Sequence, residues 1–348
     1  MPEQLRAAVV GYGLAGAIFH APLIAADPAM TVAVIVTSSA ERTERARQEH
    51  PAARILATSA ELFADPADID LVVIATPNRS HAPLALQAIV AGLPVVVDKP
   101  FAVTSSEAEQ VIAAADKAGL PLSVFHNRRW DSDFRTVQKL VTDGSLGQVQ
   151  RFESRLERWR PAPKGGWREL GTTAEGAGNL YDLGSHLIDQ ALTLFGPVAN
   201  VYCELDHRRG GVNADDDAFL ALSHTSGVRS HLWMSAVAAQ HGPRFRVLGS
   251  DSAYVTHSTD PQEDALRAGH RPVPGQPWGT VDPAHEGQLG TPDNTRPIPT
   301  IPGDWRLFYR MMTEAITNGG PVPVDARDAV ETLKILERAQ TAARGGSI

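Results

Sequence analysis

The feature that most constrains the fold is a glycine-rich segment, GYGLAG, at residues 11–16. It follows a short apolar run, residues 5–10, and precedes a segment typical of a helix, after which a second apolar run covers residues 31–36. Glycines at this spacing permit a tight turn, close approach of a pyrophosphate and close packing of helix on strand. The following helix N-terminus offers free N–H groups to phosphates. The pattern predicts a dinucleotide-binding βαβ unit; the alternative is a tight turn without a ligand. The predicted cofactor contacts in this segment are Gly11, Gly13, Leu14, Ala15 and Gly16.

The end of the second apolar run bears on which cofactor is bound. An NAD site usually has an acidic residue there for the ribose 2′-hydroxyl, whereas this chain has Thr37, Ser38 and Ser39, followed by Arg42. Hydroxyls and a nearby guanidinium suit a 2′-phosphate, which a carboxylate would repel. We therefore expect NADP as cofactor, with NAD possible. The two serines could equally cap a helix that starts near residue 40.

Further apolar runs alternate with helical segments through the first third of the chain. Residues 71–75 are an unbroken apolar run, as in a parallel strand buried on both faces, and residues 94–98 and 122–126 read as further strands. They predict an α/β, doubly wound parallel sheet of about six strands, a Rossmann domain at residues 1–126. Ligands bind such sheets at the carboxyl ends of the strands. The residues expected there are Gly11, Ser38, Thr76, Lys99 and Asn127.

The pattern changes in residues 127–348, which we expect to form a second, α+β domain. Strand-like runs cover residues 148–158 and then recur between residues 198 and 257 without intervening helices. They predict a large open, mainly antiparallel sheet of five or six strands with one face free for a partner. We expect a loop at residues 159–178, an irregular segment at residues 260–302 that is functional or mobile, and helices at residues 305–318 and 325–343.

Residues 179–196, NLYDLGSHLIDQALTLFG, read as a helix that carries polar chemistry. Asp182, His186 and Asp189 recur at helical spacing and would share one stripe. A carboxylate one turn from an imidazole is suited to proton transfer, although a merely hydrated polar face would look the same. Lys99 ends a buried strand and is followed by proline, which would place it at the cofactor crevice; the alternative is a surface lysine in a turn.

The overall composition excludes some classes of function. A formal net charge of −8 disfavours binding to nucleic acid or to an anionic membrane. No apolar run approaches the roughly 18 residues that a membrane-spanning helix needs. The single cysteine, Cys203, lies in a strand-like run and fits a small core residue in a reducing compartment. The cysteine usage and the lack of a spanning run lead us to expect a cytoplasmic protein. The histidines show no spacing typical of zinc ligands, so we expect no catalytic metal.

Three segments together resemble the Gfo/Idh/MocA oxidoreductases along the whole chain. They are GYGLAG at residues 11–16, VVVDKP at residues 95–100 and YDLGSHLID at residues 181–189. The family pattern has Glu where this chain has Asp98, which carries the same charge on a shorter side chain. HNRRWDSDF at residues 126–134 is similar to the NADP-dependent scyllo-inositol dehydrogenase-like subgroup.

The resemblance implies roles for individual residues. Lys99 and His186 match the family's catalytic pair, and Asp182 matches a residue that contacts both substrate and histidine. Positions matching cofactor contacts are Thr76, Pro77, Asn78, His81, Asp98, Lys99, Trp167 and Arg168, to which strand-end Asn127 is added. Substrate hydroxyls need hydrogen-bonding groups, supplied by Lys99, Asp182 and His186. Further candidates, each able to sit in a surface salt bridge instead, are Arg128, Arg158, Lys164 and Tyr181.

The expected reaction is interconversion of a secondary alcohol and a ketone on a polyol or sugar, inositol-like, by hydride transfer. His186 would act as the base, Asp182 would support it and Lys99 would stabilise the alkoxide. Two alternatives remain open: a nicotinamide-dependent glycoside hydrolase and a non-catalytic cofactor or sugar sensor. The resemblance also implies a homodimer or homotetramer formed through the C-terminal sheet, and final helices that pack back on the first domain.

Overall fold

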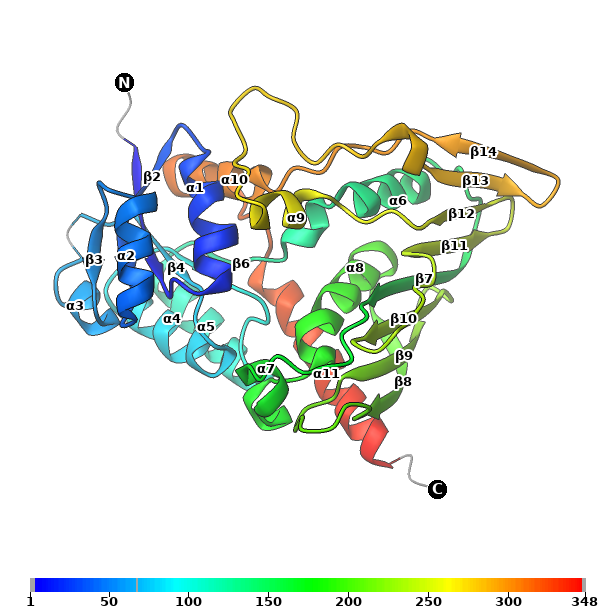
Figure 1. The fold of residues 1–348 in the computed structure, drawn as a ribbon, viewed down its shortest axis with the longest axis horizontal. Helices are drawn as coiled ribbons and strands as arrows, with labels where there is room; N and C mark the ends of the chain where they lie inside the picture. The colour runs from blue at the N-terminus through cyan, green and yellow to red at the C-terminus, as the bar shows by residue number, and fades with distance from the viewer. Residues whose placement is uncertain (1–3, 67, 346–348) are drawn as a thin grey trace. The chain divides into compact units, whose positions relative to one another are not determined.

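The computed structural model describes residues 4–66 and 68–345, and the chain divides into two compact units (Figure 1). Unit 1 comprises residues 1–127, 262–278 and 305–330, and unit 2 comprises residues 128–261, 279–304 and 331–348. Both units are therefore assembled from segments that are distant in the sequence. The domain boundary expected after residue 126 stays a prediction. None of the described helices is both long enough and apolar enough to span a bilayer.

Unit 1 is built on a six-stranded parallel sheet in the order β3-β2-β1-β4-β5-β6. This is the strand order of the dinucleotide-binding fold, with the crossover direction reversing between β1 and β4. The predicted doubly wound sheet is confirmed. All residues of β4 and residues 7–10 of β1 are buried, as expected for parallel strands covered on both faces. The strands are β1 Leu5–Val10, β2 Met30–Val36, β3 Arg54–Leu56, β4 Leu71–Ile74, β5 Val95–Val97 and β6 Leu122–Val124.

Capping residues in the sequence mark the ends of helices that connect the strands of this sheet. Ser39 caps α2 by accepting a hydrogen bond from the Arg42 N–H. Thr104 and Glu107 form a reciprocal capping box at the start of α5, and Gly119 ends that helix with a φ of 65°. The helices are α1 Ala21–Ala25, which continues a π-helical turn at Ala15–His20, α2 Ala40–Glu49, α3 Ser59–Ala64, α4 His81–Val90 and α5 Ser105–Ala118.

Two later segments complete unit 1. They contain α9 (Gln262–Arg267) and α10 (Arg306–Asn318), and α10 packs against α1. Phe308 of α10 meets Phe125 edge-on, with ring centroids 4.8 Å apart, and Trp305 meets Phe19 at 5.8 Å. Burial of each such ring contributes about 1.5–3 kcal/mol, so α10 is an integral part of the core of this unit.

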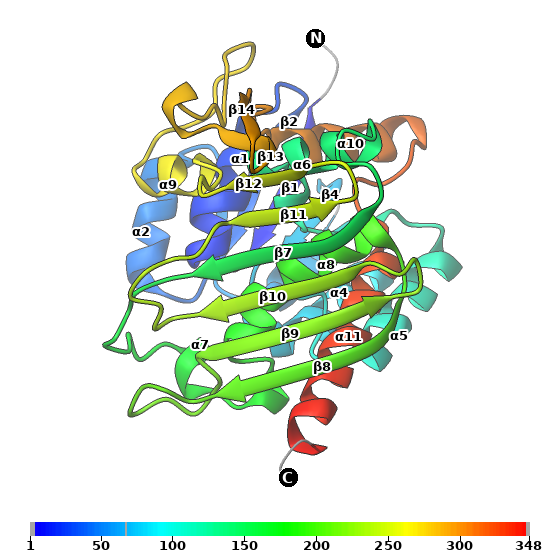
Figure 2. The same ribbon diagram turned by 90° about the vertical axis from the view of Figure 1, so that its right-hand side faces the viewer.

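Unit 2 is built on an eight-stranded sheet in the order β14-β13-β12-β11-β7-β10-β9-β8. Neighbouring strands are antiparallel except β7 and β10, which confirms the mainly antiparallel expectation. Figure 2 shows one face of this sheet, with α8 (Ser185–Phe195) behind it. α8 packs against β7 and β10. The strands are β7 Val149–Glu157, β8 Val198–Asp206, β9 Asp217–His224, β10 Arg229–Ser235, β11 Phe245–Gly249, β12 Ala253–Thr256, β13 Gly287–Thr291 and β14 Asn294–Ile298.

The sheet of unit 2 is larger than expected, because β13 and β14 come from the segment predicted to be irregular. Residues 260–302 also contain α9 and a 3₁₀ turn at Pro283–His285, so the prediction of an irregular excursion is wrong. Most side chains of the hairpin are exposed, and only Gly287 and Leu289 of β13 are buried. Two buried positions, one of them glycine, are too few to give the alternating apolar pattern that marks a strand. The remaining helices are α6 Ser132–Thr142, α7 Trp167–Leu170 and α11 Ala326–Gly345, which begins in unit 1.

Two smaller expectations also need correction. The segment at residues 159–178, expected as a loop, contains α7 and a 3₁₀ turn at Thr173–Glu175. The helix expected at residues 179–196 begins with a π-helical turn, Leu180–Gly184, before α8 continues it. Asp182 lies in the π turn and His186 lies in α8. The simple i, i+4 relation of a uniform α-helix therefore does not apply between them.

Candidate functional site

The glycine-rich loop joins β1 to the following helix and leaves no room for side chains at two positions. Gly11 has a φ of 98°, and a Cβ there would lie 2.7 Å from the Ala75 carbonyl oxygen. A Cβ on Gly16 would collide with the Gly11 carbonyl oxygen. The loop is thus held close against the end of β4 and against its own helix. Leu14 is 43% exposed and Ala15 is half-buried, so this end of the helix is open to a ligand.

The segment after β2 places a guanidinium next to this loop. Thr37 is buried, Ser38 is exposed and Ser39 caps α2. A Cβ on Gly13 would lie 3.6 Å from the Arg42 guanidinium, so the Arg42 side chain reaches from α2 back to the glycine loop. Across residues 4–66 and 68–345, no carboxylate forms an ion pair with Arg42. This cation is therefore available to an anion bound at the loop.

Arg45, three residues further along α2, has a different environment. Its Nε donates to the Glu49 carboxylate at 3.1 Å. Glu49 also accepts a hydrogen bond of 2.6 Å from the Tyr12 hydroxyl, and burial together with this carboxylate raises the pKa of Tyr12. Arg45 is thus paired with a carboxylate, whereas Arg42 has no such ion pair among the described residues.

The loops after β4 and β5 lie at the same sheet edge. Thr76 and Lys99 are half-buried, Pro77 is exposed and Asn78 is buried. Lys99 directly follows Asp98, whose carboxylate accepts a hydrogen bond of 2.9 Å from the Lys99 N–H. The Lys99–Pro100 peptide bond is cis. Asn127, also buried, follows β6 in a 3₁₀ turn. The parallel strands therefore bring the predicted unit 1 residues to one edge, as the sequence indicated.

Asp98 lies among groups that sequence reasoning did not find. His20 is fully buried, with its Nε2 3.7 Å from Asp98 Oδ1 and its Nδ1 2.6 Å from the Tyr309 hydroxyl. Burial raises the pKa of Asp98, but His20, Lys99 and His81 outweigh that effect, and the pKa stays below its ordinary value. Asp98 is therefore an ionised carboxylate facing inward. His20 and Tyr309 are far apart in sequence, and no spacing signal connects them.

In unit 2, the predicted catalytic residues lie on the π turn and on α8. Asp182 is half-buried and accepts a hydrogen bond of 3.2 Å from Arg168 Nε. His186 is 6% exposed. Asp189 is buried and forms a two-pronged ion pair with Arg129, the shortest contact being 2.6 Å. The three residues therefore have different environments: Asp182 is a half-buried carboxylate, His186 is a buried imidazole, and Asp189 belongs to a buried ion pair that holds α8 in place.

The other predicted unit 2 contacts have varied surroundings. Trp167 and Arg168 open α7, with the guanidinium 4.6 Å from the indole centroid. Arg128 donates to Asp131 at 3.0 Å, in an ion pair that is largely buried and not on the surface. Lys164 is exposed, Arg158 is half-buried and Tyr181 is buried at the start of the π turn. The roles of these residues stay predictions.

Two carboxylates that were not predicted from the sequence form hydrogen bonds with the segment that contains α7 and the π turn. The Asp215 carboxylate accepts a hydrogen bond of 2.7 Å from the Leu180 N–H, and burial raises the pKa of Asp215 to about 6. Glu169 accepts from the N–H of Lys164 at 2.7 Å and from Arg209 at 2.9 Å. These groups fix both ends of the segment that carries Trp167 and Arg168. The acidic run 215–217 was the available signal.

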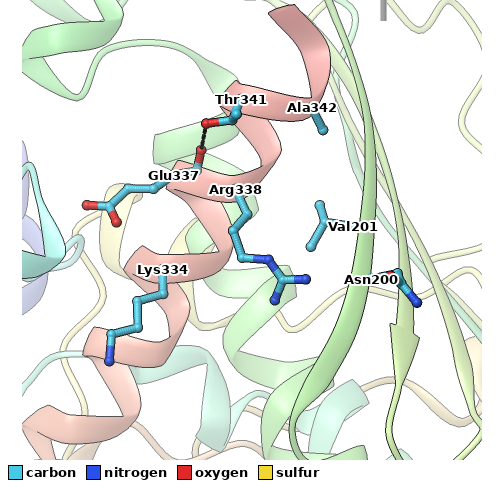
Figure 3. A pocket seen from close by; sticks show the side chains of 7 residues that line it. All are labelled: Asn200, Val201, Lys334, Glu337, Arg338, Thr341 and Ala342. Atoms are coloured by element: carbon cyan, nitrogen blue, oxygen red, sulfur yellow. Dashed lines mark hydrogen bonds between the residues drawn. The ribbon is translucent and has the colours of Figure 1, made fainter. Parts of the chain in front are cut away.

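A hollow of about 630 Å³ between β8 and α11 contains none of the predicted site residues (Figure 3). Its lining includes Asn200, Lys334 and Arg338. Arg338 donates to the carbonyl oxygens of Val198 and Ala199 at 3.0 and 2.7 Å. These bonds occupy part of the free backbone edge of β8, an outermost strand, and so protect it from pairing with another chain.

Comparison with known proteins assigns both halves of the chain. Residues 5–126 match the oxidoreductase family model described as an NAD-binding Rossmann fold. Residues 134–255 match the GFO/IDH/MocA C-terminal domain.

Individual relatives match over nearly the full length. The scyllo-inositol 2-dehydrogenase (NADP(+)) IolW of Bacillus subtilis is 36% identical over 98% of this chain and 94% of its own. The uncharacterised oxidoreductase YdgJ of Escherichia coli is 40% identical over 97% and 96%. The solved structure of yvaA from Bacillus subtilis superimposes with a TM-score of 0.92 at 35% identity, covering 99% of this chain and 97% of that one. The chain therefore belongs to the Gfo/Idh/MocA family of NAD(P)-binding oxidoreductases.

Proposed function

We propose that this protein is an NADP-preferring dehydrogenase or reductase that interconverts a secondary alcohol and a ketone on an inositol-like polyol or a sugar. The observation that carries the proposal is the position of Lys99, which follows β5 after Asp98 at the sheet edge that also bears the glycine loop. A relative with 36% identity is named as an NADP-dependent scyllo-inositol dehydrogenase, which supports the same substrate class.

The residues present fit a dinucleotide that carries a 2′-phosphate. Gly11 and Gly16 keep the loop free of side chains where a pyrophosphate would approach. Arg42 lies against Gly13 without an ion-pair partner among the described residues, and Thr37, Ser38 and Ser39 offer hydroxyls and no charge. A guanidinium binds a phosphate through several parallel N–H donors. NADP is therefore the preferred cofactor in this proposal.

The glycine loop and Arg42 would hold the nicotinamide cofactor, which would supply the hydride chemistry, and the side chains handle the proton and the charge. His186 takes the hydroxyl proton as general base, a role worth roughly 10²–10⁴-fold in rate. Asp182, held by Arg168, supports the imidazolium that forms. Lys99 stabilises the negative charge that develops on the substrate oxygen. In the reverse direction the same groups protonate the oxygen of a ketone.

The test is a screen of inositols, aldoses and polyols with NADP and NAD separately, following absorbance of the reduced cofactor. We expect Lys99→Ala and His186→Ala each to lower kcat at least ~100-fold while NADPH still binds. Lys139→Ala is the matched control, because Lys139 of α6 is exposed and pairs with Asp143, the residue after that helix. Near-normal turnover in either site variant would disprove the role of that residue. Turnover of a glycoside without net cofactor reduction would favour a hydrolase, and cofactor binding without turnover of any compound would favour a sensor.

We further propose that the outer face of the unit 2 sheet forms a homodimer or homotetramer. Tyr202 is 55% exposed, and its neighbours on this face include Phe219 and Trp233, whose ring centroids are 5.1 Å apart. Arg155 stacks on Trp233 at 3.8 Å. Exposed aromatic and Arg side chains are enriched at such interfaces. Light scattering of the wild type and of Tyr202→Lys tests this, and a monomeric wild type at working concentration would disprove it.

A further inference from the structure

His81 is a fully buried histidine that joins two loops of unit 1. It is the first residue of α4, and its side chain has no exposed surface. Its Nδ1 lies 2.8 Å from the Pro100 carbonyl oxygen, and its Nε2 lies 2.8 Å from the Thr76 carbonyl oxygen. The ring therefore bridges the loop after β4 to the loop after β5, and it has no surface to offer a ligand.

The two partners of the ring make this bridge unusual. Carbonyl oxygens only accept, so a neutral imidazole donates to one of them and the imidazolium donates to both. Complete burial lowers the pKa of His81, whereas the carboxylate of Asp98 and the two carbonyls act in the opposite direction; His20 adds to the lowering. The charged or titratable groups that act on the ring are therefore Asp98 and His20.

Another buried histidine does not face two acceptors that a neutral ring cannot both satisfy. His224 of unit 2 places Nδ1 2.8 Å from the Gly196 carbonyl oxygen and Nε2 2.8 Å from the Ser230 hydroxyl. A hydroxyl can donate or accept, so one neutral tautomer of His224 satisfies both neighbours. His224 thus serves as a matched control. It is buried, it has a hydrogen-bond partner at each ring nitrogen, and it belongs to the other unit, far from Lys99 in sequence.

Lys99 lies between two anchored backbone positions. On one side, the Asp98 N–H donates to the Ile74 carbonyl at 2.8 Å, and the Asp98 carboxylate accepts from the Lys99 N–H. On the other side, the Pro100 carbonyl oxygen lies 2.8 Å from Nδ1 of His81, which donates to it in the Nδ1-protonated tautomer and in the imidazolium. The first anchor belongs to the strand ladder, whereas the second depends on one side chain. Removing that side chain releases the turn on one side of Lys99.

We propose that His81 is a positioning residue: it fixes the Lys99–Pro100 turn against the Thr76 loop and acts on the reaction through Lys99. This inference rests on the proposed catalytic role of Lys99. A displacement of about 1 Å in a reacting group costs up to ~100-fold in rate, so a loosened turn is expected to lower kcat while the glycine loop keeps its affinity for NADPH.

A double-mutant cycle tests the proposal, with single-turnover rates for the slow variants. We expect His81→Ala to lower the rate roughly 10- to 100-fold in the wild-type background and less than about twofold in the Lys99→Ala background, because the second change acts through a group already removed. NADPH affinity, measured by fluorescence without substrate, is expected to change less than about threefold. His224→Ala is expected to leave the rate unchanged.

Rate losses that multiply in the double variant, or a loss of NADPH affinity without a loss of rate, would overturn the inference. If His81→Ala does not fold, His81→Asn, which keeps one donor, enters the same cycle with the same expectations. Near-normal turnover in Lys99→Ala alone would instead overturn the proposed catalytic role of Lys99. The two failures are therefore distinguishable.

Discussion

Replacing Arg42 with Ala is the sharpest test of cofactor preference. The Arg42 guanidinium lies beside Gly13, and in the part of the chain that the structure describes no carboxylate pairs with it. Its removal breaks no ion pair there, so the free energy of unfolding is expected to change by no more than about 0.5 kcal/mol. The effect should instead appear in binding of a phosphate that only NADPH carries.

The expected magnitude follows from hydrogen bonds to a charged group, which contribute about 1.5–3 kcal/mol. That range corresponds to a rise of roughly 10- to 150-fold in the Kd for NADPH, while the Kd for NADH changes less than about twofold. Fluorescence or calorimetric titration of both reduced cofactors measures the two constants directly. Because charge attraction is screened, the loss should be smaller at high salt.

Arg45→Ala is the matched control for this experiment. Arg45 lies on the same helix, and its Nε donates to Glu49. We expect Arg45→Ala to leave the ratio of the two Kd values unchanged. An unchanged ratio in Arg42→Ala, or an equal change in both variants, would refute the assignment of Arg42 to the 2′-phosphate.

Two further predictions concern the support of the site. Gly16→Ala should abolish NADPH binding or prevent folding, because the added Cβ would collide with the Gly11 carbonyl. The control Gly210→Ala should do neither, because the space around Gly210 is open. A folded Gly16→Ala protein that binds NADPH with wild-type affinity in a titration would contradict this prediction. Burial raises the pKa of Asp215 to about 6, so the folded state keeps a proton that the unfolded state releases, and the free energy of unfolding falls as pH rises from about 4 to about 6. Asp215→Asn should lack that part of the fall, up to ~3 kcal/mol, in urea unfolding at about pH 4 and about pH 7; identical pH dependence in both proteins would contradict it.

The Rossmann part of the fold could be predicted from the sequence because its signals are local. Parallel strands covered on both faces need continuous apolar runs, and the glycine loop needs positions without Cβ atoms; both requirements are visible within a few residues. β3 was not identified because it begins with the exposed Arg54 and none of its three residues is fully buried, so it shows no apolar run. Its place in the sheet comes from pairing with β2.

The candidate site was predictable in part. Lys99, the glycine loop and the helix around His186 lie in recognisable motifs. By contrast, the π turn at Leu180–Gly184 and the support from Asp215 were not predicted. A single inserted backbone position leaves no mark on apolar periodicity over so short a stretch, and a capping carboxylate 35 residues away has no fixed spacing from its helix.

The sequence by itself determined the order of strands and helices around the glycine loop and the positions of the chemically active side chains along them. Only the tertiary structure decided which buried polar groups meet: His20 with Tyr309, 289 residues away, and His81 with two loop carbonyls. It also decided that Arg42 lies against the glycine loop while Arg45 is paired. The physical reason is that strand and helix patterns record burial residue by residue, whereas a hydrogen bond between distant segments depends on where the whole chain brings them.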